Sequence, residues 1–269
     1  MKKIIREAMM EEMESSGFRL IRENGDTWVK LLDQNKVVHI YHMQFVPWRR
    51  ETTIDFILYP IIFPYWCGWR DYKGGIHLSN IDCYCYDNDA AQEMRYDERE
   101  RQKLFYKMHN AQSEQELNQF KEEYSEMLRY IYVHRAKPFF AQSCNMSTCI
   151  DTCEEIEDRQ RQVLYDAGEL AYNMYYVDNY LYKCIYDGNI DDYIRHLEEY
   201  NRLYFDYYGR EYTFYANHES LTRYKARDAE YFMNKYKKVQ EENAEEAARL
   251  LGMDKEAFPY VPPLKELKL

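Results

Sequence analysis

The hydrophobic pattern of the chain changes near residue 88. Before that point, short alternating runs of apolar and polar residues are separated by turn residues, as in antiparallel strands. After it, apolar residues recur every three or four positions, as in helices. The sequence therefore predicts an α+β protein: within 1–88 an N-terminal helix plus an antiparallel β-meander of four to five strands, and within 89–269 a mostly α-helical region of helical hairpins packed on it.

The N-terminal region divides at its turn residues. Lys2 to Ser15 is predicted to be a helix that ends at Gly17, because glycine tolerates the left-handed conformation of a helix end. Strands are predicted at 18–21, 27–31, 37–45 and 52–59, with a possible fifth at 76–86. Consecutive short strands without intervening helices favour an antiparallel meander with the first helix on one face.

The helical region is read in the same way. Helices are predicted at 91–110 and 114–134, the second starting with the capping pattern Ser113-x-x-Glu116. Pro138 is predicted to break the helix before a loop at 139–151, because proline lacks an N–H group.

Further along, a helical hairpin turns at Gly188 and closes at Gly209, and one long helix at 217–251 ends at Gly252. The extended Pro-rich tail, 254–269, is too apolar for a solvated terminus and is predicted to fold back on a groove.

Composition limits the possible partners. The chain has 269 residues and a formal net charge of −11, which repels phosphate backbones, so nucleic acid is an unlikely partner. No apolar run approaches the roughly 20 residues of a spanning helix, and Met1 to Glu14 lacks the apolar core of a signal peptide. With 7 cysteines, an odd number, reduced thiols are favoured. We expect a cytoplasmic protein without a membrane partner.

No catalytic or metal-binding motif is complete. His39 and His42 lie three positions apart in a predicted strand, so their side chains should point to opposite faces. The cysteines match no standard zinc spacing. Asp192 and His196 are explained by ordinary pairing within a helix. The sequence therefore predicts no metal and no cofactor.

Aromatic residues supply the candidate binding sites. The chain contains 29 tyrosines, whose rings suit half-buried helix faces and interfaces. The first candidate is a glycine-spaced loop, which is either a partner-binding surface or a small satellite core. The second is a tyrosine stripe on a long helix, which either packs centrally among helices or meets another protein. The loop residues are Tyr65, Trp66, Trp69 and Tyr72, and the stripe residues are Tyr165, Tyr172, Tyr176 and Tyr180.

The N-terminal order of helix, Gly17-Phe18, hairpin, Thr27-Trp28 and an extended run ending near Gln44 resembles uncharacterised bacterial domain-of-unknown-function proteins. The resemblance covers about the first quarter of the chain. It implies an α+β start and no particular activity.

Two functional hypotheses follow. The first is a non-enzymatic protein-binding module of a bacterial cytoplasm, such as an immunity, inhibitor or regulatory protein, whose acidic surface meets a basic partner protein. The alternative is a small-molecule enzyme with a pocket at the junction of sheet and helices, using residues such as His42, His77, Asp192 or His196.

Overall fold

The computed structural model describes residues 2–21, 26–46, 51–63, 99–100, 102–155, 174–209 and 215–269. Contacts divide the described residues into two compact units. Unit 1 draws on Met1–Tyr59 and Trp69–Arg159, and unit 2 on Pro60–Gly68 and Gln160–Leu269. The α+β class is confirmed by an N-terminal helix, a four-stranded sheet and a mostly helical remainder. The predicted boundary near 88 lies outside the described residues.

The sheet of unit 1 follows the chain in order. Its strands are β1 (Arg19–Ile21), β2 (Asp26–Leu32), β3 (Val37–Val46) and β4 (Glu51–Pro60), arranged β1-β2-β3-β4. The β1–β2 and β2–β3 pairs are antiparallel, as predicted. The possible fifth strand at 76–86 falls outside the part of the chain that the structure describes.

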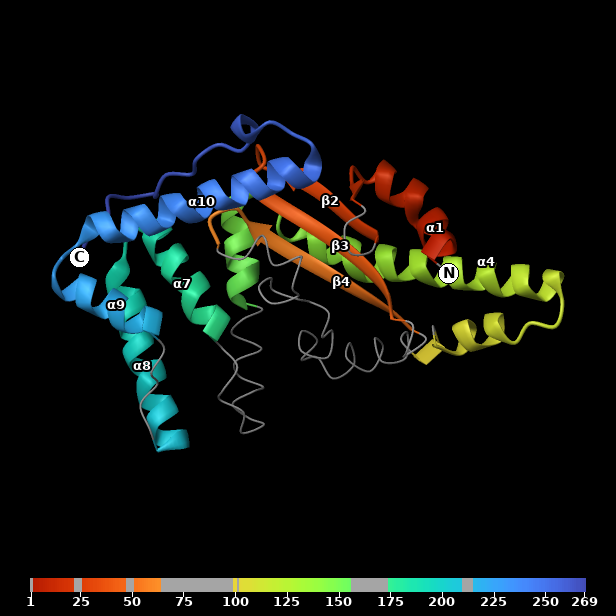
Figure 1. Ribbon diagram of the computed structural model, residues 1–269, viewed down its shortest axis with the longest axis horizontal. Helices are drawn as coiled ribbons and strands as arrows, with labels where there is room; N and C mark the ends of the chain where they lie inside the picture. Colours follow the sequence, from red (N-terminus) through yellow and green to blue (C-terminus); the bar gives the residue numbers. More distant parts are fainter. Residues whose placement is uncertain are drawn as a thin grey trace. The chain divides into compact units, whose positions relative to one another are not determined.

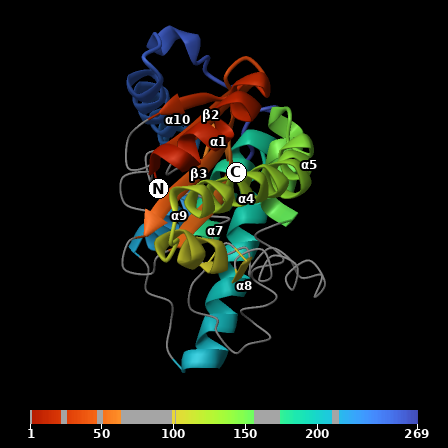
Figure 2. The same ribbon diagram turned by 90° about the vertical axis from the view of Figure 1, so that its right-hand side faces the viewer.

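Helix α1 (Lys2–Ser15) contacts α4 (Glu114–Ile131) and β2 (Figures 1 and 2). Met9 and Met13 of α1 are fully buried. The helix ends as predicted, because Gly17 has a φ of +84°. After it, Phe18 packs against the rings of Tyr132 and Phe140, which draws the strand region and the later helices into one aromatic core.

The predicted cap of α4 is confirmed, since the Glu116 N–H donates to the Ser113 hydroxyl at 3.1 Å. The predicted break at Pro138 is wrong. The chain passes from α4 through a π-helical turn, η2 (Tyr132–Ala136), directly into α5 (Lys137–Ala141). Pro138 lies in the first turn of α5, where a missing N–H costs little.

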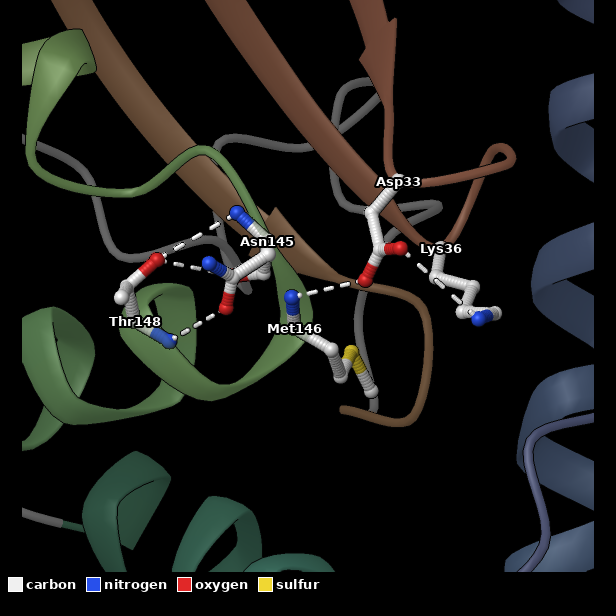
Figure 3. Close-up of polar contacts among 5 residues, drawn as sticks. All are labelled: Asp33, Lys36, Asn145, Met146 and Thr148. Carbon is white, nitrogen blue, oxygen red and sulfur yellow. Dashed lines mark hydrogen bonds and ion pairs between the residues drawn. The ribbon is translucent and has the colours of Figure 1, made fainter.

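The predicted loop at 139–151 is also wrong, because a helix begins at 146 and is described through 155. Asn145 caps it: the Thr148 N–H donates to Asn145 Oδ1 at 3.0 Å, and the Asn145 N–H donates to Thr148 Oγ1 at 3.3 Å. The Met146 N–H donates to the carboxylate of Asp33, in the β2–β3 turn, at 2.9 Å (Figure 3). A carboxylate at a helix N-terminus is stabilising, so Asp33 fastens this helix to the hairpin.

Unit 2 contains the predicted helical hairpin, α7 (Met174–Asp187) and α8 (Ile190–Tyr208). Gly188 turns it and Gly209 closes it, with φ of +73° and +64°. The prediction of one helix at 217–251 is wrong, since the chain forms α9 (Tyr215–Lys225) and α10 (Ala229–Leu251). Arg227 has a φ of +54°, and Asp228 then caps α10 by accepting the Tyr231 N–H at 3.0 Å.

Candidate recognition groove along helix α10

The C-terminal tail folds back along α10 in unit 2, as the sequence predicted (Figure 1). After the short helix η4 (Lys255–Ala257), the chain runs back beside α10. Phe258 and Val261 are both buried, with exposed fractions of 6% and 5%. These two side chains anchor the tail by removing apolar area from water.

A buried amide on α10 fixes the tail's backbone. Gln240 Nε2 donates to the carbonyl oxygen of Val261 at 3.2 Å, and Gln240 Oε1 accepts the Val261 N–H at 2.8 Å. One side chain therefore satisfies both backbone polar groups of a buried residue. Without these two hydrogen bonds, the N–H and carbonyl groups of Val261 would be buried without a partner.

The far part of the tail lies against the α7–α8 turn. The Leu264 N–H donates to the Tyr186 carbonyl oxygen at 2.7 Å, and the Lys268 N–H donates to that of Gly188 at 3.3 Å. A Cβ atom on Gly188 would lie 2.9 Å from Lys265 Cβ and 3.0 Å from two tail carbonyl oxygens. Glycine is required here both by its positive φ and by this close approach.

A second buried amide on α10 holds the segment that follows β4. Asn243 Nδ2 donates to the carbonyl oxygens of Ile61 and Phe63, each at 2.7 Å. Ile61, Ile62 and Phe63 are all buried. The buried side of α10 thus binds two other segments of backbone, the tail and the turn after β4, each through a side-chain amide.

Between α10 and the tail lies a groove with a volume of about 350 Å³. Apolar groups of α10 and the tail form part of its lining, and charged side chains complete it. This volume is at the lower end of the range of ~300–1,000 Å³ for ligand pockets, which suits one or two side chains. The lining residues are Lys237, Gln240, Glu241, Ala244, Lys255, Glu256, Phe258, Pro259 and Tyr260.

Tyr260 presents an aromatic ring in this groove. Its side chain is 45% exposed, and its ring lies edge-on to Tyr236 at a centroid distance of 6.2 Å. Partial burial raises the pKa of Tyr260. Burial also raises the pKa of Tyr236, helped by the nearby Tyr260, Tyr186 and Asp187. Both phenols are therefore neutral at physiological pH, and Tyr260 offers an apolar ring with a polar tip.

The charges of the lining balance, since it contains Lys237 and Lys255 together with Glu241 and Glu256. Lys255 forms an ion pair with Glu245 at 2.5 Å, and the pKa of Lys255 is raised by that hydrogen bond. Within the described residues, Lys237, Glu241 and Glu256 have no ion pair shorter than 4.0 Å. Glu241 and Glu256 also raise the pKa of Lys255, so both carboxylates interact with that ammonium group.

The aromatic candidates from the sequence fall mostly outside the described residues. This applies to all four loop residues, Tyr65, Trp66, Trp69 and Tyr72, and to Tyr165 and Tyr172 of the stripe. Tyr176 and Tyr180 lie on α7. The Tyr180 ring contacts the His196 ring of α8 in a tilted arrangement with a centroid distance of 4.8 Å, and Lys183 Nζ lies 5.6 Å from the Tyr180 ring centroid.

The candidate histidines of the enzyme hypothesis have local structural roles where they are described. His42 is buried and its Nδ1 shares a hydrogen bond of 2.7 Å with Thr27 Oγ1, directly across the β2–β3 pair. His196 contacts Tyr180, while Asp192 pairs with Arg195 and accepts from Asn189 at the start of α8. His77 is outside the described residues.

The imidazole of His39 has a strongly perturbed pKa. Burial lowers its pKa to about 4, and Lys30 contributes, while the hydrogen bond to the Ser143 carbonyl acts in the opposite direction. Both His39 and Ser143 are buried, at 2% and 0% exposure. A neutral, enclosed imidazole serves packing, because no substrate can reach it. In the described ranges no three His, Cys, Asp or Glu side chains are grouped to hold a metal ion.

The sequence patterns did not identify four residues of this region as functional candidates, namely Gln240, Asn243, Glu241 and Tyr260. The apolar, Pro-rich tail was a usable signal that a groove exists, but no local pattern indicates which face of a long helix receives it. An uncharged amide inside an apolar stripe, as at Gln240, was the available hint.

No family model matches the chain, and no match was found among curated proteins or solved structures. Among the described helices, none has the length and apolar character that crossing a membrane requires.

Proposed function

We propose that this chain is a non-enzymatic protein-binding module, acting as an immunity, inhibitor or regulatory protein in a bacterial cytoplasm, and that its partner presents a basic surface. The observation that carries the proposal is the groove along α10. It combines the half-exposed ring of Tyr260, the apolar side chains of Ala244 and Phe258, and charged side chains of both signs. Aromatic side chains in a partly desolvated setting are typical anchors of protein interfaces.

Charge supports the same conclusion. A formal net charge of −11 steers basic proteins toward the chain and disfavours acidic ones. The described histidines named in the enzyme hypothesis have structural contacts that explain them. A binding role instead uses exposed side chains of the groove, such as Tyr260. The aromatic loop around Trp66 and Trp69 stays a second candidate surface, predicted from sequence.

The test is to capture partners with the intact chain, purify each captured protein and measure its binding. We expect at least one stoichiometric complex whose Kd rises steeply between 50 and 200 mM salt, because screening weakens opposite charges at an interface. A salt-insensitive complex would contradict the basic partner. Failure of every purified candidate to bind would overturn the protein-binding proposal itself.

A further inference from the structure

We infer that the tail is itself a ligand, and that Pro259 and Pro262 form a proline face held outward for a partner protein with an aromatic-lined groove. The inference rests on the proposed protein-binding function and specifies the chemistry of the partner's site. Three observations carry it: the conformation that the sequence imposes on the tail, the side of the tail that is buried, and the contacts that fix it.

The sequence of the tail favours the polyproline II conformation. A proline has its φ fixed at about −65°, and a residue that precedes a proline is pushed toward extended conformations. In the segment 258–263, only Tyr260 neither is a proline nor precedes one. Phe258, which precedes Pro259, has a φ of −105° and a ψ of 95°, in the extended region. The segment is therefore extended before any partner binds it.

Burial along the tail follows the period of this conformation. Polyproline II has three residues per turn, so residues three positions apart lie on the same side. Phe258 and Val261 are buried, at 6% and 5% exposure, and form one side. Pro259 and Pro262, each one position later, are both exposed, and Tyr260 is 45% exposed. The proline face therefore lies in solvent, with the tyrosine ring beside it.

Contacts outside the tail fix its backbone. Gln240 of α10 binds both the N–H and the carbonyl group of Val261, as a polyproline II segment requires, because it has no hydrogen bonds of its own. At the far end, where the chain bends, the Leu264 N–H donates to the Tyr186 carbonyl oxygen at 2.7 Å. A ligand that is already ordered loses little conformational entropy on binding.

These features select one class of partner site. A partner that adds the tail to a sheet edge needs free backbone groups, but prolines have no N–H and Gln240 occupies both groups of Val261. Aromatic-lined grooves, as in SH3 and WW domains, instead bind the side chains of an extended proline segment. Pro259 and Pro262 are one turn apart, about 9 Å, and both are exposed for such a groove.

The experiment uses the full chain and, as probes, a panel of purified SH3 and WW domains. We expect saturable binding of the intact chain to at least one domain in calorimetric titrations. Failure of every domain to bind would overturn the inference. It would leave the protein-binding function intact, because the capture of partners tests that function separately.

Variants then locate the site. Pro259→Ala and Pro262→Ala should each weaken binding of that domain by ~5-fold or more. Both prolines are exposed, so the fold should persist in these variants, which their unfolding midpoints would verify. Pro138→Ala is the matched control, since it removes an exposed proline that lies in the first turn of α5. If Pro138→Ala weakens binding as much as the tail variants do, the inference fails.

A free peptide tests whether the outward face is the one that binds. The peptide Ac-Phe-Pro-Tyr-Val-Pro-Pro-Leu-Lys-amide has the sequence of the tail without its contacts to α10. We expect the intact chain to bind the same domain at least as tightly as the peptide does, because its tail is already ordered. Binding of the peptide but not of the intact chain would show that the domain needs Phe258 and Val261, which are buried, and would overturn the inference.

Discussion

His39 Nε2 donates a hydrogen bond of 2.8 Å to the backbone carbonyl oxygen of Ser143, which lies 104 residues away in the sequence. The Ser143 hydroxyl is also within 3.1 Å of the same nitrogen, and the imidazole stacks on Phe140 at 4.7 Å. Strand β3 is joined in this way to the end of the α5 helix. Because the protonated imidazole could also donate this hydrogen bond, the pH dependence arises from the burial of His39, which lowers its pKa.

Acid should destabilise unit 1 through His39. Its pKa is about 4 in the folded protein and ~6.5 in the unfolded chain, so the unfolded state binds more protons between these values. The stabilising contribution is complete above pH 6.5 and is lost as the pH falls toward 4, by roughly 3 kcal/mol. Unfolding midpoints measured from pH 7 to pH 4 would show this loss.

His39→Gln keeps a donor for Ser143 and removes the titration, so it should flatten part of that pH dependence. His134→Gln, which removes an exposed imidazole of η2, is the control and should retain the full loss. Parallel pH profiles for wild type and His39→Gln would contradict the assignment.

Gly188→Ala should loosen the tail. The new methyl group would lie 2.9–3.0 Å from Lys265 and the Glu266 carbonyl, in addition to the strain of a φ of +73°. Gly209→Ala is a close control, since φ is +64° and nothing lies within 4 Å. We expect Gly209→Ala to cost about 1 kcal/mol and Gly188→Ala to cost at least about 1 kcal/mol more.

Limited proteolysis distinguishes the two glycine variants further. Cleavage within 258–269 should accelerate in Gly188→Ala alone. If both variants lose equal stability and resist protease equally, the tail does not lie close to Gly188 in solution.

Gln34→Gly should stabilise the β2–β3 turn. Asp33, Gln34 and Asn35 have successive φ values of 48°, 57° and 67°, a conformation that costs a side chain such as glutamine about 1 kcal/mol. The gain should be ~0.5 kcal/mol, because glycine also increases the entropy of the unfolded chain. Chemical denaturation would measure it.

Asn35→Gly provides the comparison, since asparagine already tolerates this conformation and should gain less than Gln34→Gly. A loss of stability in Gln34→Gly would show that the glutamine side chain contributes more than its backbone costs.

The exposed Cys144 should react first with a thiol reagent. The thiols of Cys149, Cys153 and Cys184 are buried, at 0%, 1% and 2% exposure. Because three further cysteines lie outside the described residues, the informative measurement is the difference between wild type and Cys144→Ser under native conditions. The variant should lose one rapidly reacting thiol while keeping its slow ones. An unchanged rapid phase would contradict this.

Local sequence patterns predicted the elements that local forces determine. The four strands follow from alternation, and the end of α1 at Gly17 and the cap at Ser113 follow from backbone and capping chemistry. The errors arose where a local rule had two outcomes. A proline can end a helix or occupy its first turn. Here the π-helical turn η2 leads directly into α5, and Pro138 lies in the first turn of α5.

The candidate groove was predictable only in part. The apolar tail had to fold back, but its partner Gln240 is 21 residues from Val261, and Asn243 is 182 residues from Ile61. Such contacts depend on which surfaces meet in the folded chain. The periodicity of apolar residues indicates which face of a helix is buried, but not which segment covers it. Similarly, Asp33 and Met146 are 113 residues apart in the sequence, so no motif near either residue predicts their hydrogen bond.

The Asn243 contact has a consequence for the timing of folding during synthesis. Ile61, Ile62 and Phe63, which are buried in the folded protein, leave the ribosome long before Asn243, which binds the carbonyls of Ile61 and Phe63 and follows Ile61 by 182 residues. At elongation rates of about 5–20 residues per second, that interval is roughly 10–40 s. During this time the segment with these three apolar side chains lacks its contact with Asn243. Nascent chains with exposed apolar side chains recruit chaperones or aggregate. Expression temperature and chaperone supply should therefore affect the yield of this protein more than its final stability would suggest.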